Sequence, residues 1–397
     1  MCIHVSRTVN AMSNKGRVAI VTLPGYFNYG NRLQLYATGQ IYASLGYSVE
    51  ALIAKQYSDS SKDNGLRRRL KTAARKLLGL SSDASPQSTS SRERIAAFRK
   101  FSALINERFV EDPKSIACED YVLFSCGSDQ IWNPESLSSG NDRGVARLVH
   151  GVLDPSRERR MIEWFFLGFC PRGKRIALAP SIGLDSLSGE RARALKLGVR
   201  NFDRLSIRER RGAELIKDIA GRNAEVICDP TLVLDSSEWR KVANRSLTPS
   251  SPYVLTYLLG KTGEDVFNIL DEVTGDGELP VVSLSDRQKP GEPDAGPAEF
   301  VSLIDNAVHV VTDSYHAAVF ASILQTPLTV VRREGGTSMF SRLETLAQIL
   351  GIEHKLYGSP DFDLSRAGDY EGVPEAIERE RKKFLDYLER CLDGARV

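Results

Sequence analysis

The sequence predicts an α/β protein of two domains, each built on a parallel sheet. Short apolar runs with the length of buried strands alternate with apolar residues at helical spacing along the 397 residues. A polar stretch rich in Ser and Pro, residues 244–252, interrupts the series, and a second series of strands follows it. We therefore expect a first domain over residues 1–245 and a second domain over residues 250–397.

Ten strands are expected, each bounded by Gly, Pro or polar residues. The six in the first domain are residues 18–23, 48–54, 121–126, 175–179, 204–207 and 225–228. The four in the second domain are residues 253–259, 280–284, 307–311 and 328–331. Because the strands alternate with helices, we expect them to be parallel, with helices on both faces of each sheet. Apolar spacing also predicts amphipathic helices over residues 95–109 and 377–392.

A basic, low-complexity segment interrupts the first domain at residues 58–91. Its Lys and Arg residues accompany leucines at helical spacing, and the run SSDASPQSTSS follows them. The basic part is compatible with a short amphipathic helix near an anionic membrane or a lipid-linked substrate. A solvated insertion is the favoured interpretation.

Composition narrows the class of function and the compartment. The chain is 42% hydrophobic and 26% charged, and its net charge of +2 gives no chain-wide electrostatic reason for a nucleic-acid partner. The six cysteines lack CxxC spacing, so we expect neither a metal site nor a disulfide framework, and a cytoplasmic location with reduced thiols. No apolar run approaches the length of a membrane span, so membrane contact would be peripheral, at the inner face.

The most informative stretch is residues 312–324, TDSYHAAVFASIL. Asp313 and Ser314 are good N-cap residues between an apolar strand and a helical apolar pattern, which places His316 in the first turn of a helix. Free backbone N–H groups at the start of such a helix bind anions, so this imidazole can meet both a phosphate and the proton chemistry beside it. A histidine that only caps or packs is the alternative at this point.

Polar residues follow the expected strands where each strand ends. In an open parallel sheet these ends share one edge, where ligands bind. The loop over residues 25–37, GYFNYGNRLQLYA, places Asn28 and Asn31 at this edge, with amides suited to a hydroxylated ligand. The segment GSDQIWNP adds Asp129 close to Trp132, a polar and aromatic pairing that sugars favour. Turn-forming residues and a core tryptophan are the alternatives.

Arginines and aspartates also follow strands. Arg208 ends one strand in the first domain, and Arg332 and Arg333 end the last good strand of the second. Arginines at such an edge can fork onto a carboxylate or a phosphate, although a surface arginine without a partner is common. Asp229 and Asp313 have the chemistry to orient the histidine or accept a proton, or else to form turns.

The ordered set of these segments resembles the polysaccharide pyruvyl transferase family. The matching motifs are GYFNYGNRLQLYA, GSDQIWNP, RIALAPSIG, SIRERRGAELI, CDPTLVLDSSEW, YVLTYLLG, EFVSLIDNA, TDSYHAAVFASIL and SMFSRLETL. They extend from about residue 17 to residue 351 in the order of the family. The combination is specific, although each motif alone is not.

The resemblance implies a GT-B-like architecture, in which two Rossmann-like domains with parallel sheets face each other across a cleft. The acceptor belongs to the first domain and the donor to the second. It also implies transfer of the pyruvyl group of phosphoenolpyruvate onto two sugar hydroxyls of a polysaccharide, such as an exopolysaccharide, or of a glycan precursor. The product is a ketal and phosphate is released. Neither a metal nor an organic cofactor is implied, because phosphoenolpyruvate is a co-substrate.

Site residues follow from the matched motifs and from position at the strand ends. The expected catalytic residues are His316, Arg208 and Asp313. The expected donor-binding residues are Ser314, Tyr315, Arg332 and Arg333. The expected acceptor-binding residues are Asn28, Asn31 and Asp129.

One departure from the family pattern bears on activity. The family commonly has Phe before the motif histidine and Gly-Thr after it, whereas here Tyr315 precedes His316 and Ala317 and Ala318 follow it. If a threonine hydroxyl holds the donor, this chain lacks it. A nucleotide-sugar glycosyltransferase of GT-B fold and a non-catalytic glycan-binding relative are therefore the alternative functions.

Overall fold

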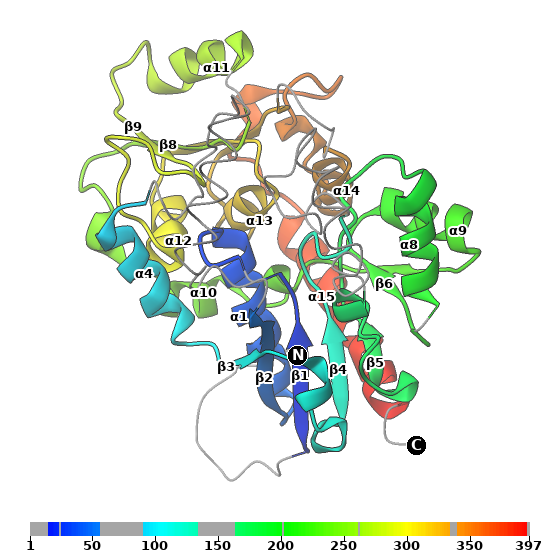
Figure 1. Cartoon of the computed structure of the whole chain (residues 1–397). Coiled ribbons are helices and arrows are strands. Elements are labelled where there is room, and N and C mark those ends of the chain that lie inside the picture. The colour runs from blue at the N-terminus through cyan, green and yellow to red at the C-terminus, as the bar shows by residue number, and fades with distance from the viewer. Residues whose placement is uncertain are drawn as a thin grey trace, which may run out of the picture.

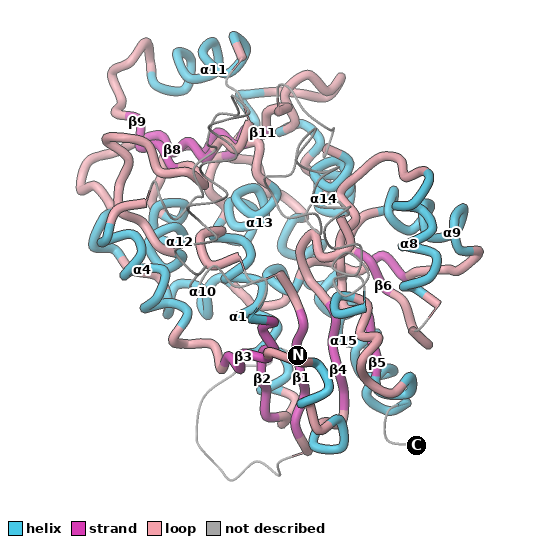
Figure 2. The backbone as a smooth tube through the Cα atoms, viewed as in Figure 1, coloured by secondary structure: helices cyan, strands magenta, loops and turns pink. Residues whose placement is uncertain are grey.

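The computed structural model describes residues 15–23, 25–55, 90–133, 163–200, 202–260, 263–333 and 340–394. Parallel strands form two main sheets, one in each half of the molecule (Figure 1; Figure 2). The first has the order β3-β2-β1-β4-β5 and the second the order β11-β10-β8-β9. Every pairing between the described strands is parallel. The predicted α/β fold class, with a parallel sheet in each half of the chain, is confirmed.

The strands are short and mostly buried. Their bounds are β1 Arg17–Val21, β2 Ser48–Ala54, β3 Glu107–Val110, β4 Leu123–Cys126, β5 Arg175–Ala177, β6 Ser206–Ile207, β7 Glu225–Val226, β8 Val254–Tyr257, β9 Val281–Leu284, β10 His309–Thr312 and β11 Leu328–Val330. Strands β6 and β7 form a separate pair, which a single bridge from Arg204 to Ile176 connects to the first sheet.

Helices connect most of the strands and cover the sheets. The α-helices are α1 Tyr29–Ser44, α4 Arg92–Ser102, α8 Gly189–Val199, α9 Arg210–Ala220, α10 Ser236–Val242, α11 Glu264–Thr274, α12 Pro297–Asp305, α13 Tyr315–Leu324, α14 Ser341–Leu350 and α15 Val373–Gly394. The short 3-10 helices are η2 Pro113–Ser115, η3 Cys118–Asp120, η4 Arg172–Lys174, η5 Pro230–Leu232, η6 Arg245–Leu247, η7 Glu353–Lys355 and η8 Leu364–Arg366. No helix within the described ranges has both the length and the apolar character needed to cross a membrane.

The ten expected strands are present, with ends that differ by a few residues. The helix expected over residues 95–109 was wrong in its second part, because α4 ends at Ser102 and residues 107–110 form β3. This four-residue edge strand pairs with β2, and it is too short for strand and helix periodicity to be distinguished in the sequence. The expectation for residues 58–91 lies outside the described residues, apart from Ser90 and Ser91.

Helix α1 joins the two halves. Its first residue, Tyr29, is fully buried and stacks on Phe300 of α12 with ring centres 4.6 Å apart. The Tyr29 hydroxyl donates to the carbonyl of Ala295 at 3.1 Å. One hydrophobic core contains side chains of both sheets, such as Ile20 and Val310, so the halves share a common interior. The packing around α1 fixes the distance between the two sheets at the place where their strand ends meet.

The boundary near residue 250 separates the two main sheets, but two helices pack against the opposite half. From the first half, α4 extends to the second sheet, where Arg94 Nη2 donates to Ser285 O at 2.8 Å. From the second half, α15 returns to the first sheet, where the Tyr387 hydroxyl donates to Ala177 O of β5 at 2.8 Å. In Figure 1, α15 is the red helix that runs beside β5. Each half of the chain therefore provides a helix that packs against the sheet of the other half.

We expect Phe300→Ala to reduce the free energy of unfolding by about 3–5 kcal/mol, because it empties the space between Tyr29 and Phe320. The matched control is Phe267→Ala on α11, whose side chain is 56% exposed, and it should change stability by less than about 0.5 kcal/mol. Urea unfolding followed by fluorescence measures both. Equal effects of the two substitutions would contradict a shared core around α1.

Candidate functional site

Asp229, at the start of η5, is the centre of a buried polar cluster. Its side chain is fully buried. Oδ2 accepts from Arg208 Nη1 at 2.7 Å, and the Ser128 hydroxyl is 2.8 Å away from the same oxygen. Oδ1 accepts from the backbone N–H and the hydroxyl of Thr231, at 3.0 and 2.8 Å. Strand ends of the first half thus hold this carboxylate from several directions.

His316 brings the second half of the chain to this carboxylate. It lies in the first turn of α13, is 7% exposed, and its Nε2 is 3.7 Å from Asp229 Oδ2. That distance is longer than a hydrogen bond, and Nε2 has no other partner. The other ring nitrogen, Nδ1, faces the backbone of Gly30 in α1, where a Cβ atom would lie 2.0 Å from it. Only glycine at position 30 leaves room for the imidazole.

The charges of Asp229, Asp129 and Arg208 stabilise one another. Burial opposes ionisation of Asp229, but His316 and Arg208 outweigh burial and hold its pKa well below the usual range. Burial likewise opposes ionisation of Asp129, whose pKa is nevertheless lowered by Arg208 and His316. The Arg208 guanidinium is buried, yet Asp229 and Asp129 raise its pKa. Arg208 is therefore a permanent cation between two carboxylates.

Asp129 and Asn31 extend the cluster toward α1. Asp129 Oδ1 accepts from Arg208 Nη2 at 3.4 Å, and its Oδ2 accepts from Asn31 Nδ2 at 3.4 Å. Trp132, three residues after Asp129, does not belong to the cluster. Trp132 is 1% exposed and stacks on Phe166 in the core, so the expected sugar-binding role of this ring is wrong and the core alternative is correct.

The Tyr315 ring lies beside the cluster. The Arg208 Cζ atom is 4.5 Å from the ring centre, and the Arg342 Cζ atom of α14 is 5.9 Å from it. The ring meets His316 edge-on at 5.4 Å. Burial is the main cause that raises the pKa of Tyr315, so its hydroxyl stays protonated while its face contacts cations.

A second polar group forms at the strand ends of the second half. Asp313 accepts from the N–H groups of Leu259 and Gly260, both at 2.7 Å, and from Arg333 Nε at 3.1 Å. Its carboxylate is therefore engaged with the end of β8 and with Arg333 rather than with His316. Asn28 Nδ2 points to Asp286 Oδ2 at 3.5 Å, across the boundary between the halves.

The structure brings together only part of the expected site. The cluster around Asp229 contains His316, Arg208, Tyr315, Asn31 and Asp129. The remaining expected residues make other contacts and are not part of this cluster: Asn28, Asp313, Ser314, Arg332 and Arg333. Ser314 is the N-cap of α13 but makes no capping bond through its side chain. Arg332 is exposed, pairs with Glu344 at 3.1 Å and covers the Phe340 ring. The roles of all these residues remain predictions.

Sequence reasoning missed three residues of the cluster, and it considered Asp229 as a group that orients the histidine, accepts a proton or forms a turn. The missed residues are Ser128, Gly30 and Arg342. Each lies within a matched motif, but its neighbours in space come from distant segments, so spacing along the chain could not single it out. Among the described residues, no group of three or more His, Cys, Asp or Glu side chains is placed to hold a metal ion.

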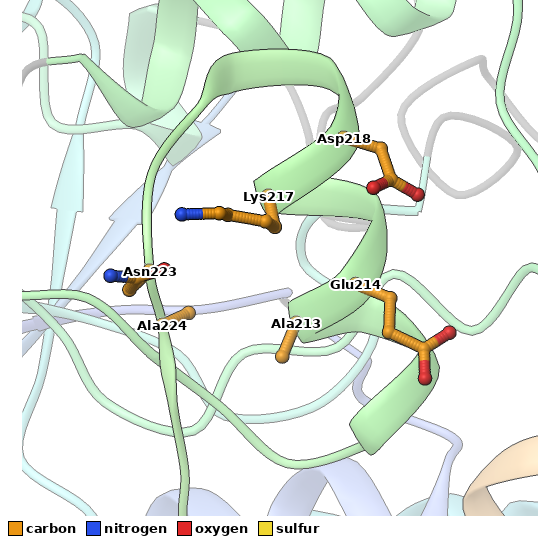
Figure 3. A pocket seen from close by; sticks show the side chains of 6 residues that line it. All are labelled: Ala213, Glu214, Lys217, Asp218, Asn223 and Ala224. Atoms are coloured by element: carbon orange, nitrogen blue, oxygen red, sulfur yellow. The ribbon is translucent and has the colours of Figure 1, made fainter.

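A surface pocket beside α9 lies apart from the cluster (Figure 3). Its lining residues are Ala213, Glu214, Lys217, Asp218, Asn223 and Ala224. Figure 3 shows the Lys217 and Asn223 side chains extending to one side and the carboxylates of Glu214 and Asp218 to the other. Because no residue of the Asp229 cluster lines it, we do not assign it to the candidate site.

We expect Asp229→Asn to lower the free energy of unfolding by about 3–5 kcal/mol at neutral pH, since it removes the main counter-ion of the buried Arg208. The folded pKa of Asp229 is below its unfolded value, so its contribution is present above about pH 4 and is lost as the pH falls through the folded pKa. The variant should therefore show a flatter loss of stability in acid, measured by urea unfolding between pH 2 and 7.

The matched control for this substitution is Asp305→Asn, which removes a partner of Arg240 at the surface. Its cost should stay below about 1 kcal/mol because water screens the pair. A cost for Asp229→Asn as small as that of the control would show that the buried carboxylate does not hold the cluster together.

Comparison with known proteins agrees with the sequence motifs. Similar solved structures include a UDP-GlcNAc 2-epimerase from Neisseria meningitidis bound to UDP-GlcNAc, 10% identical over 91% of this chain and 99% of that chain, with a TM-score of 0.39. The glycosyltransferase SsfS6 of Streptomyces sp. SF2575 is 11% identical over 94% and 96% of the two chains, with a TM-score of 0.34. No curated protein matches the sequence. The family model described as polysaccharide pyruvyl transferase matches residues 28–335, and the chain therefore belongs to the polysaccharide pyruvyl transferase family.

Proposed function

We propose that this protein transfers the pyruvyl group of phosphoenolpyruvate onto two hydroxyls of a sugar in a polysaccharide or glycan precursor. The family assignment supports a transferase that acts on polysaccharide. The observation that carries the finer proposal is the buried His316, whose Nε2 has no hydrogen-bond partner and lies among guanidinium groups. A buried, unpartnered ring nitrogen is suited to proton transfer with a bound substrate.

The donor suits the charges around this histidine. Phosphoenolpyruvate carries a carboxylate and a phosphate, so its site needs cations or oriented N–H groups. Arg208 and Arg342 lie within reach of the Tyr315 ring, next to His316. Ser314 provides no side-chain cap for α13, so the backbone N–H groups of its first turn receive no acceptor from that side chain, and the start of a helix favours an anion.

The reaction then follows in two additions. A proton adds to the methylene carbon of phosphoenolpyruvate, which becomes a methyl group, and the neighbouring carbon becomes an oxocarbenium-like centre. The first sugar hydroxyl forms a C–O bond to that centre and loses its proton. The C–O bond to phosphate breaks, phosphate leaves with its electron pair, and the second hydroxyl attacks and loses its proton. The products are the cyclic ketal and hydrogen phosphate.

His316 is the residue we assign to the proton transfers. Its Nε2 is the atom that we assign to give a proton to the methylene carbon, and the Asp229 carboxylate lies 3.7 Å from this nitrogen. Asn31 and Asp129 are the groups that we expect to bind the acceptor hydroxyls. Ala317 and Ala318, which replace the family's Gly-Thr, are fully buried in the main core. The scheme needs no metal or organic cofactor.

Phosphate release from phosphoenolpyruvate tests the proposal. With a mixture of cell-surface glycans or lipid-linked sugars as acceptor, the wild type should release phosphate and form pyruvylated product, detected by mass spectrometry. His316→Asn should lower the rate by about 10²–10⁴-fold, the usual contribution of a general acid and base. The control His354→Gln changes another buried histidine, in η7, and should leave the rate unchanged.

Two results would count against the proposal. Release of phosphate at the same rate in His316→Asn would exclude the assigned proton carrier. Stabilisation by a nucleotide sugar and not by phosphoenolpyruvate, measured as a shift of Tm, would instead favour a glycosyltransferase.

The contact between Gly30 and His316 gives a second prediction. In Gly30→Ala the added methyl group overlaps the imidazole and displaces it. The rate should fall by at least about 100-fold, which is the effect of moving a catalytic group by about 1 Å. The control is Gly39→Ala in the same helix, where no atom lies within 4 Å of the new Cβ atom. It should keep the activity and raise stability by up to about 1 kcal/mol. Full activity in Gly30→Ala would show that the ring position is not critical.

A further inference from the structure

Arg342 differs from the other arginine of the cluster in its partners. Arg208 already uses both terminal nitrogens on carboxylates, at 2.7 Å to Asp229 and 3.4 Å to Asp129. Arg342 forms no salt bridge with any residue in the described part of the chain. Arg208, expected as a catalytic residue, is thus already paired with two carboxylates, whereas Arg342 is paired with none.

The partners that Arg342 does have are neutral. The Gln130 amide satisfies its neighbours when its oxygen faces the guanidinium. In that orientation the oxygen accepts from Arg342 Nη1 at 3.0 Å and from Arg342 Nη2 at 2.8 Å. Nε has no partner, although the residue is only 9% exposed. Burial and then Arg208 lower the pKa of Arg342 to about 10, and the nearby carboxylates of Glu209 and Asp129, which raise it, offset this only in part.

Arg94 shows that a buried guanidinium can be stabilised in another way. It donates to Ser285 O and lies 5.1 and 5.6 Å from the ring centres of Tyr29 and Phe98. The two aromatic faces stabilise the Arg94 cation, although Arg94 Nε and Nη1 also lack hydrogen-bond partners. Arg342 has one ring, Tyr315, and at the longer distance of 5.9 Å.

We propose that Arg342 is the guanidinium that binds the anionic part of the donor, and that Arg208 is a positioning residue that holds Asp229 beside His316. The identity of the donor as phosphoenolpyruvate rests on the proposed function above. The N–H of Arg342 Nε and a terminal N–H on the same edge form the fork that carboxylate and phosphate groups accept. Both groups have this chemistry, so the experiment must distinguish them.

Calorimetric titration of the full-length protein provides that experiment. Wild type and Arg342→Gln are each titrated with phosphoenolpyruvate, inorganic phosphate and pyruvate. We expect Arg342→Gln to bind phosphoenolpyruvate about 100-fold more weakly, which is the effect of losing a charge-assisted hydrogen-bond pair. Weakened binding of phosphate alone would assign Arg342 to the donor phosphate, and weakened binding of pyruvate alone would assign it to the carboxylate.

The chain offers a matched control in Arg210→Gln. Arg210 is exposed, and its Nη1 donates to the amide oxygen of Gln348 on α14 at 2.8 Å. The substitution removes the same charge and the same kind of bond from the contact between α9 and α14. It should leave the binding of phosphoenolpyruvate unchanged.

Stability without ligand separates a binding role from a structural one. Because no carboxylate pairs directly with the buried Arg342 guanidinium, Arg342→Gln should unfold at the wild-type Tm or above it, while losing the Tm increase that phosphoenolpyruvate gives the wild type. A lower Tm with unchanged binding would indicate a structural residue. If Arg342→Gln fails to fold, Arg342→Lys keeps the charge without the fork and should still bind at least about 10-fold more weakly.

The two proposals fail in different ways. Equal affinity of the wild type and Arg342→Gln for phosphoenolpyruvate would overturn the role of Arg342 and leave the proposed function intact. Wild-type binding of inorganic phosphate that depends on Arg342, without any binding of phosphoenolpyruvate, would overturn the proposed function and leave an anion site at Arg342. As a test of positioning, Arg208→Gln should lower kcat by a larger factor than it raises KM for the donor. It should also lower the stability of the protein.

Discussion

The buried ion pair between Arg208 and Asp229 is the constraint on which the candidate site depends. Both side chains are removed from water, so each would be very costly without the other. Ser128 and Thr231 complete the shell of the carboxylate, so Arg208, Ser128 and Thr231 reach it from three separate strand ends. His316 then approaches from the other half of the molecule. A charge that must stay paired therefore fixes how the strand ends of the first half are arranged, and it determines where the second half can place its imidazole.

The interface between the halves provides the second constraint. Tyr29 packs into the aromatic cluster of the second half, and one residue later Gly30 receives the His316 ring. The same turn of α1 thus fixes the spacing of the two sheets and the position of the imidazole. Asn28, which caps α1 through Asn31 N at 2.9 Å, points its amide toward Asp286 in the second half. Packing and site geometry are therefore coupled, and a change in one should be felt in the other.

Much of the fold could be predicted because strand and helix periodicity is local. Apolar runs such as residues 48–54 form strands with the predicted bounds, and the start of α13 lies where Asp313 and Ser314 indicated. The short strand β3 could not be recognised, because four residues do not define a period. Within the site, His316, Arg208 and Asp129 follow from motifs. The pairing of Asp313 with Arg333, and the exposure of Arg332, depend on tertiary contacts that the sequence does not encode locally.

Polar groups that lack partners show where the structure departs from ordinary protein interiors. Buried N–H and carboxylate groups are nearly always satisfied, because an unmade hydrogen bond is costly. Here Arg208 Nε, Arg342 Nε, His316 Nε2 and Glu209 Oε2 are all buried and without partners. The first three are donors or proton carriers that border the Tyr315 ring. The fold pairs Arg208 with two carboxylates and pairs Arg342 with none, which is the asymmetry on which we base the proposed binding of an anionic donor. That asymmetry is expected of a site that binds an anion and not of a purely structural ion network.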